Sequence, residues 1–142
     1  MADNTEVLGV KVGDTAEFTK TVSDADITKF ADVTGDNQPL HLDDAYAAKT
    51  RFKKRLAHGM LSAGFISAAL GTKLAPNATV IYLSQSLQFR RPVFPGDTIT
   101  ARLEVTAIDP DKRFVTCKTE CANQDGQTVL SGEAQVLLDP LP

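Results

Sequence analysis

The sequence predicts an α+β domain in which an antiparallel sheet wraps around one long central helix. Three observations lead to this prediction: residues 58–74 are apolar on almost all sides, one strand-like segment precedes them, and four strand-like segments follow. The chain has 142 residues, of which 42% are hydrophobic, and this is enough for one core. We therefore expect a single domain over residues 1–142, without a linker or an internal repeat.

The first elements are a strand and a short helix. Alternation of apolar and polar residues predicts the strand over residues 15–22. Ser23, with Asp26 three residues later, is close to a capping box. Apolar residues recur at helical spacing behind this cap, so residues 24–34 are expected to form an amphipathic helix.

A second short helix and the long helix come next. Two aspartates favour the start of a helix over residues 43–49, because negative charge suits the first turn. Basic residues gather over residues 49–55, and such a run is usually a solvated connection. Residues 58–74 are rich in small residues, which indicates a helix buried on most sides.

From residue 79 onward the chain is almost entirely strand-like. Strands are expected over residues 79–91, 98–108, 113–122 and 128–138, with Pro/Gly or Asp-Gly turns between them. Consecutive strands joined by tight turns predict an antiparallel meander.

The two cysteines and the charge exclude several classes of protein. Cys117 and Cys121 share a predicted strand and a face, but about 13 Å separates them at a rise of about 3.3 Å per residue. That is too far for a disulfide, and the absence of a nearby histidine makes a poor metal site, so we expect two buried thiols and no metal. A net charge of -3 argues against nucleic-acid binding.

The polar N-terminus and the segment lengths bear on location. Residues 1–6 are polar with no apolar run behind them, so no secretory signal is expected. No stretch is long enough to span a bilayer. We therefore expect a cytoplasmic protein that does not enter a membrane.

The clearest functional signal lies between Thr34 and Leu42, which reads Thr-Gly-Asp-Asn-Gln-Pro-Leu-His-Leu. Asp36 and His41 lie five residues apart, on a segment that Gly35 and Pro39 keep from forming a continuous helix. An aspartate and a histidine suit proton transfer near neutral pH. Alternatively, Asp36 could form an Asx turn and His41 could be a surface histidine near the start of a helix.

Three blocks of the sequence, residues 30–41, 57–61 and 82–97, resemble a known family. The resemblance is to the MaoC-like (R)-specific enoyl-CoA hydratases, the hydratase-2 group of the hot-dog fold, and it covers essentially the whole chain. Asp36 and His41 keep the family's spacing, whereas Gln38 stands where an asparagine more often precedes the proline. The resemblance implies a hot-dog domain and a homodimer whose interface runs along the acyl pocket, which would also cover the exposed edge of a single sheet.

The resemblance further implies a hydro-lyase reaction, the reversible addition of water to trans-2-enoyl-CoA giving (R)-3-hydroxyacyl-CoA. The substrate is the acyl-CoA thioester itself, and no cofactor is required. Asp36 and His41 would be catalytic, because together they can hold and deprotonate one water. Gly59, at the start of the long helix, would offer a backbone N–H as the oxyanion hole for the thioester oxygen. The product would serve polyhydroxyalkanoate synthesis or related fatty acid metabolism.

Further residues are candidates for binding the substrate. These candidates are Ser62, Gly64, Phe65, Arg90 and Arg91. The first three lie on the long helix and could instead be core residues. The two arginines could instead be solvated at the end of a strand, although guanidinium groups suit the phosphates of coenzyme A. His58 could contact a ligand, but a structural hydrogen bond or a helix cap is the expected role.

Three other functions are alternatives for the same layout. A dehydratase acting on acyl carrier protein substrates would need a basic docking surface, for which residues 49–55 are a candidate. A hot-dog thioesterase would want a carboxylate on or near the long helix, and residues 58–74 contain none. An acyl-CoA-binding module would keep the pocket but would lack the acid–base pair.

Overall fold

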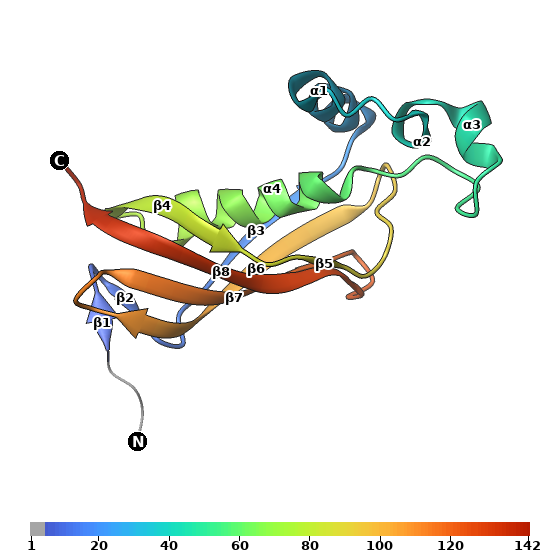
Figure 1. Ribbon diagram of the computed structural model, residues 1–142. Coiled ribbons are helices and arrows are strands. Elements are labelled where there is room, and N and C mark those ends of the chain that lie inside the picture. The colour runs from blue at the N-terminus through green and yellow to red at the C-terminus, as the bar shows by residue number, and fades with distance from the viewer. Residues whose placement is uncertain (1–4) are drawn as a thin grey trace.

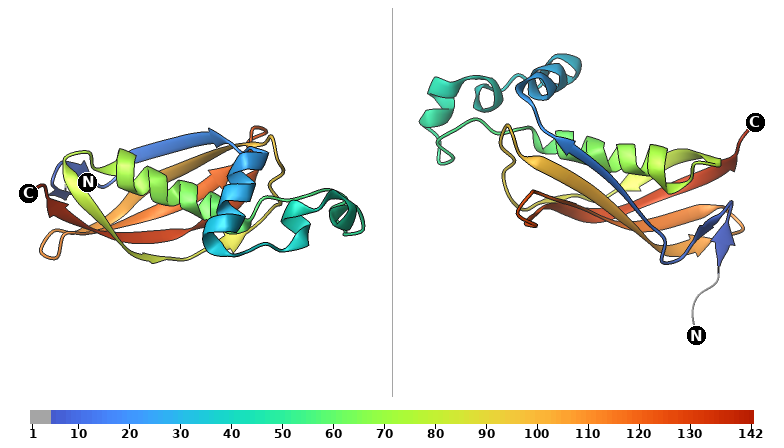
Figure 2. Two further views of the ribbon diagram at one scale, coloured as in Figure 1. Left: turned by 90° about the horizontal axis from the view of Figure 1, so that it is seen from above. Right: turned by 180° about the vertical axis from the view of Figure 1, so that it is seen from behind.

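The computed structural model describes residues 5–142 and has two layers, a curled antiparallel sheet and a long helix lying against one face of it (Figure 1). Three short helices lie at one end of this pair of layers, and the second and third extend beyond it, as the view from above shows (Figure 2). Residues 1–4, which include most of the polar N-terminal segment, lie outside the described residues. The α+β prediction of a sheet around a central helix is confirmed.

The helices follow the expected order. They are α1 (Asp24–Thr34), α2 (Pro39–Leu42), α3 (Asp44–Ala48), α4 (Gly59–Ala69) and the π-helical turn η1 (Leu70–Leu74). The single long helix that was predicted over residues 58–74 therefore ends in a π-helical turn, and α2 was not predicted. The strands are β1 (Glu6–Val7), β2 (Val10–Lys11), β3 (Thr15–Thr21), β4 (Ala78–Gln85), β5 (Gln88–Phe89), β6 (Thr98–Asp109), β7 (Phe114–Ala122) and β8 (Thr128–Pro140).

The main sheet has the strand order β3-β6-β7-β8-β4, and β5 pairs with β8. Only β6, β7 and β8 form a meander, so the prediction that four consecutive strands are neighbours was wrong for the first of them. The strand β4 pairs with β8 at the far edge, because the connection after β5 crosses to the β3 side of the sheet. This leaves β4 as an edge strand on which three large side chains are 40–43% exposed, namely Ile81, Tyr82 and Leu83.

The predicted strand over residues 79–91 is interrupted between β4 and β5. Ser86 leaves the β4 ladder, and its backbone N–H instead donates to the carbonyl oxygen of Glu133 at 2.9 Å. Gly132 of β8 passes so close that a Cβ atom there would lie 1.8 Å from the Ser86 carbonyl oxygen. Glycine is therefore needed at this position for the backbones to approach each other.

The capping box predicted at the start of α1 is confirmed. The Ser23 side chain accepts a hydrogen bond from the Asp26 backbone, and the Asp26 carboxylate accepts one from the Ser23 N–H at 3.0 Å. That backbone hydrogen bond lowers the pKa of Asp26. At the other end Gly35 adopts the left-handed conformation (φ 80°), which ends the helix immediately before Asp36.

The long helix α4 is buried on one side only. Ser62, Ala63, Phe65, Ile66 and Ala69 are its buried residues and face the sheet, whose inner positions supply most of the core. The opposite side carries the exposed residues Met60, Gly64 and Ser67, and Gly59 is exposed at the start of the helix. In the part of the chain that the structure describes, no helix is long and apolar enough to cross a membrane.

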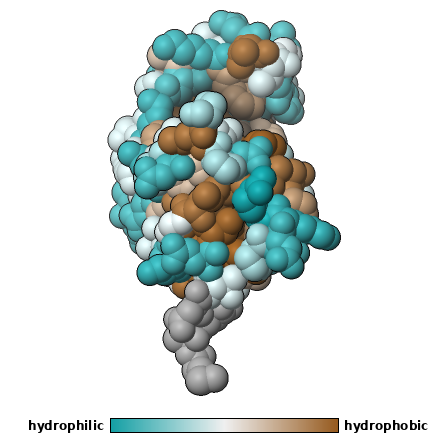
Figure 3. Space-filling model, turned by 90° about the vertical axis from the view of Figure 1, so that its left-hand side faces the viewer, coloured by the Kyte–Doolittle hydropathy of each residue, from teal (hydrophilic) through white to brown (hydrophobic). Residues whose placement is uncertain are grey.

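Apolar surface is also exposed at the end of the sheet near the two termini. There the space-filling view shows a group of hydrophobic side chains surrounded by polar ones (Figure 3). This end lies away from the three short helices.

We expect both thiols to be inert in the folded protein. Cys117 and Cys121 of β7 are free and fully buried, as predicted, and burial raises the pKa of each to about 12. Titration with a chromogenic disulfide at pH 8 should therefore detect almost no reactive thiol in the native state and two after denaturation. Rapid reaction of either cysteine without denaturant would contradict this burial.

Candidate active site

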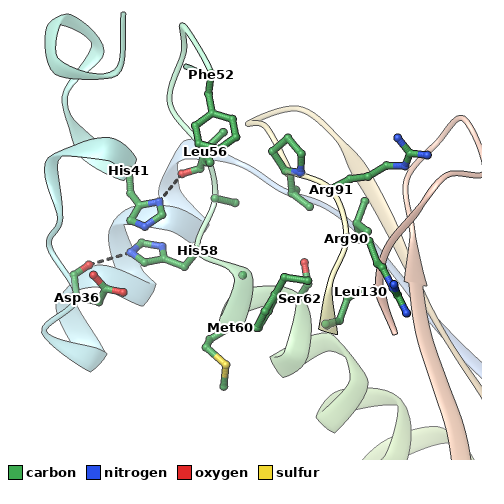
Figure 4. Close-up of a pocket in the computed structure, with 16 residues that line it drawn as sticks. Asp36, His41, Phe52, Leu56, His58, Met60, Ser62, Arg90, Arg91 and Leu130 are labelled. Atoms are coloured by element: carbon green, nitrogen blue, oxygen red, sulfur yellow. Dashed lines mark hydrogen bonds between the residues drawn. The ribbon is translucent and has the colours of Figure 1, made fainter. Parts of the chain in front are cut away.

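Asp36 lies in the connection between α1 and α2, and His41 lies in α2. These short helices lie near the N-terminal end of α4 (Figure 1). Gly35 reverses the chain after α1, and Pro39 starts α2, which turns His41 toward the interior. The His41 side chain is buried, whereas Asp36 is exposed. The close-up shows both side chains near a third residue, His58 (Figure 4).

The His41 ring is held in one orientation by a backbone carbonyl. Its Nδ1 lies 2.7 Å from the carbonyl oxygen of Leu56. Because a carbonyl oxygen can only accept, Nδ1 must carry the hydrogen, and the lone pair of the neutral ring lies on Nε2. His41 can therefore act as a base through Nε2.

His58 contacts both members of the pair. Its Nε2 lies 2.8 Å from the backbone carbonyl oxygen of Asp36, which again requires the nitrogen to donate. Its ring stacks on His41 with centroids 3.9 Å apart and an interplanar angle of 26°. The expected structural hydrogen bond is confirmed, whereas the side chain makes no helix-capping bond.

One nitrogen or carboxylate oxygen from each of Asp36, His41 and His58 lies within 4.8 Å of the others. A tetrahedral metal site needs lone pairs that converge on one point. The two imidazoles instead stack face to face, with one nitrogen of each donating to a carbonyl. The arrangement therefore suits proton transfer better than metal binding.

A pocket of about 500 Å³ opens beside these three residues. Six of the predicted site residues line it: Asp36, His41, Gly59, Ser62, Arg90 and Arg91. The rest of its wall was not predicted and is mainly apolar: Phe52, Leu56, Ala57, His58, Met60, Phe89, Pro92, Val93, Val129 and Leu130. Most of these positions could not be identified from sequence, because they come from three separate segments.

Two predicted substrate-binding residues, Gly64 and Phe65, do not line this pocket. Phe65 is buried in the core, where its ring packs against Phe18 with centroids 5.8 Å apart. Gly64 is exposed on the opposite side of α4. Gly64 therefore points away from the buried face of α4, whereas Phe65 shares that face with Ser62 but lies one turn further along the helix, beyond the pocket.

Gly59 is the first residue of α4, and its backbone N–H belongs to the first turn, where the helix supplies no partner. A Cβ atom at this position would lie 2.7 Å from the Phe89 ring. Glycine therefore lets Phe89 lie directly against the helix start, at the wall of the pocket.

Arg90 and Arg91 separate this pocket from a second hollow of about 760 Å³, which is lined also by Gly126, Gln127, Thr128 and Ser131. Arg90 Nε donates to Ser131 Oγ at 3.0 Å. Among residues 5–142 neither arginine forms an ion pair with a carboxylate. Both residues are exposed, and their guanidinium groups point away from Asp36 and His41 (Figure 4).

The chain is similar to known proteins over nearly its whole length. The family model described as MaoC like domain matches residues 8–125. An (R)-specific enoyl-CoA hydratase of Rhodospirillum rubrum is 50% identical over 91% of this chain and 88% of its own. A mitochondrial 3-hydroxyacyl-[acyl-carrier-protein] dehydratase of Arabidopsis thaliana is 37% identical over 93% of this chain and 80% of its own.

Among solved structures, the (R)-hydratase from Aeromonas caviae involved in PHA biosynthesis superposes with a TM-score of 0.86. It is 44% identical to this chain, and the match covers 91% of this chain and 97% of that one. The curled sheet, the central helix and these relatives together show that the chain belongs to the MaoC-like family and has the hot-dog fold.

Proposed function

We propose that this protein is an (R)-specific enoyl-CoA hydratase, which reversibly adds water to trans-2-enoyl-CoA to give (R)-3-hydroxyacyl-CoA. The main support is the meeting of the Asp36 carboxylate and the His41 ring at a largely apolar pocket that begins at the N-terminus of α4. The names of the relatives support the same chemistry.

The reaction requires one water, one base and one acid on the same side of the double bond. The water lies between Asp36 and His41, and its oxygen bonds to carbon 3 as His41 Nε2 takes one of its protons. The electron pair of the double bond moves toward the thioester, whose oxygen gains enolate charge. A proton from the pair then reaches carbon 2, so that water adds across the bond and no cofactor is consumed.

Gly59 stabilises the thioester oxygen in this scheme. Its N–H lies at the positive end of α4, and donors of this kind typically contribute a factor on the order of 10²–10³ in rate. The Ser62 hydroxyl is buried in the same wall without a partner among the described residues, so it is a candidate to bind the substrate's polar part. Arg90 and Arg91 would meet the phosphates of coenzyme A.

Hydration of crotonyl-CoA tests the proposal directly. The ultraviolet absorbance of the conjugated thioester should fall when purified protein is added, and a coupled (R)-specific dehydrogenase should oxidise the product. An (S)-specific dehydrogenase provides the stereochemical control. Failure to hydrate crotonyl-CoA and longer enoyl-CoAs would refute the proposed function.

A dehydratase acting on acyl carrier protein is the second candidate, supported by the named Arabidopsis relative. The basic run over residues 49–55 is only partly available for docking, because Arg55 pairs with Asp24 at 2.9 Å and with Asp44 at 2.6 Å. Assays with matched enoyl-CoA and enoyl carrier protein substrates separate the two functions. A higher kcat/KM for the carrier protein would favour the dehydratase.

We infer that the working form is a homodimer. The edge strand β4 exposes Ile81, Tyr82 and Leu83, and the outer side of α4 exposes Met60. These groups would be covered if two copies paired edge to edge. If folding is coupled to this pairing, the melting temperature should rise by about 2 °C for each tenfold increase in protein concentration. A melting temperature independent of concentration, together with a monomer in sedimentation, would contradict the pairing.

The reduced, buried thiols of β7 fit a cytoplasmic location. The relative from Aeromonas caviae is involved in PHA biosynthesis. By analogy, this protein would supply (R)-3-hydroxyacyl-CoA for such a storage polyester.

A further inference from the structure

We propose that His58 is a positioning residue for the acid–base pair, holding Asp36 through its backbone and His41 through its ring. The effect of His58 on the rate rests on the proposed hydratase function, whereas the contacts that His58 makes do not depend on that function. Nothing in the reaction requires His58 to exchange a proton.

The hydrogen bond from His58 is the long-range anchor of residues 34–37, the part of the motif that carries Asp36. The other hydrogen bonds of residues 34–37 in the described chain are local, such as Asp36 N–H to Thr34 Oγ1 at 3.2 Å and Asn37 N–H to the Gly35 carbonyl at 3.0 Å. His58 lies 22 residues away and donates from Nε2 to the Asp36 carbonyl at 2.8 Å. This bond therefore fixes the backbone that carries the exposed carboxylate to the start of α4.

The ring of His58 fixes the second member of the pair. Stacking at 3.9 Å restrains the face of His41, while the Leu56 carbonyl restrains its Nδ1 edge. Phe30 of α1 packs on the His58 ring at 4.6 Å. The imidazole thus joins α1, α2 and the start of α4 at the point where the two reacting groups meet.

The polar edge of His58 indicates that it is more than a space-filling ring. Only 2% of the residue is exposed, and its Nδ1 is buried with no partner among the described residues. An unpaired buried nitrogen is unfavourable, so an apolar ring would suit mere packing better. The gain that offsets this cost is the Nε2–H donor to Asp36.

Three variants separate positioning from stability. His58→Phe keeps a ring but removes the donor, and its kcat for crotonyl-CoA should fall about tenfold to a hundredfold, because small misplacements of reacting groups cost this much. Its KM should change by less than about threefold if substrate binding is intact. His58→Gln keeps an N–H donor without the ring and should recover part of kcat. Ile66→Ala destabilises the same helix from the core and should leave kcat near that of the unaltered protein.

A spectroscopic measurement of the protonated nitrogen in each histidine ring tests the proposal even if one variant does not fold. The chain has only two histidines, so nitrogen-15 histidine labelling gives two ring systems, and either His58→Gln or His41→Ala assigns them. We expect the proton on Nε2 in His58 and on Nδ1 in His41. A proton on Nδ1 of His58 would overturn the proposal. So would a kcat loss in His58→Phe no larger than that in Ile66→Ala. Unaltered protein that shows these tautomers but hydrates no enoyl-CoA would refute the proposed function and leave the geometry of His58 standing.

Discussion

Asp36→Asn and His41→Ala are each expected to lower kcat for crotonyl-CoA hydration by about 10²–10⁴-fold, the usual contribution of a positioned acid or base. Asp36→Asn keeps the size of the side chain but removes the anionic oxygen that holds the water. His41→Ala removes the Nε2 lone pair, which the hydrogen bond from Nδ1 to Leu56 leaves available. Initial rates over a range of substrate concentrations measure both effects, and KM should change much less than kcat.

Matched controls make this prediction specific. Asp32 is another exposed aspartate, four residues before Asp36 on α1, and it does not line the pocket. Asp32→Asn makes the same chemical change and should leave kcat within about twofold, as expected for a surface substitution away from the site. Because Asp36 and His41 act on one water, the double variant should lose little more than the worse single variant. Turnover near the normal rate in either single variant would refute the catalytic assignment.

Gly132→Ala is expected to produce the largest loss of stability among the glycine substitutions. Its Cβ would lie 1.8 Å from the Ser86 carbonyl oxygen and 2.7 Å from the Ser86 carbonyl carbon, so two backbones would have to separate. Overpacking of this kind costs about 1–3 kcal/mol and occasionally more. Urea unfolding followed by circular dichroism should show a lower midpoint with an unchanged slope.

Gly71→Ala provides the comparison for this substitution. A Cβ at Gly71 would meet no heavy atom within 4 Å, and the residue lies in the helical turn η1. Its substitution should leave the free energy of unfolding unchanged or raise it slightly, because alanine restricts the unfolded chain more than glycine does. Equal losses in the two variants would show that the contact with Ser86 is not the cause.

Features that depend on nearby residues could be predicted from the sequence. The cap at Ser23, the helix behind it and the last three strands need only local patterns, and the structure confirms them within a few residues. The Asp36–His41 pair could be recognised because both residues lie in one short motif. Gly59 could be placed at the pocket because a family block includes the start of the long helix.

Features that depend on distant contacts could not be predicted. The position of β4 beside β8 is set by a chain crossing, and the interruption after it is set by the close approach of Gly132. Phe65 was misassigned to the pocket, because an apolar helix residue gives no indication of which neighbour it meets. The hydrogen-bond partner of His58 could not be identified for the same reason, since it lies 22 residues away and is a backbone oxygen.

The interruption between β4 and β5 places the open edge of the sheet and a wall of the pocket on one short stretch of chain. β4 ends at Gln85, and Phe89, which lines the pocket, follows four residues later. Any copy of the chain that pairs with this edge also restricts the backbone that leads into the pocket wall. If pairing at this edge changes the affinity for substrate, bound substrate must change the affinity of pairing by the same factor.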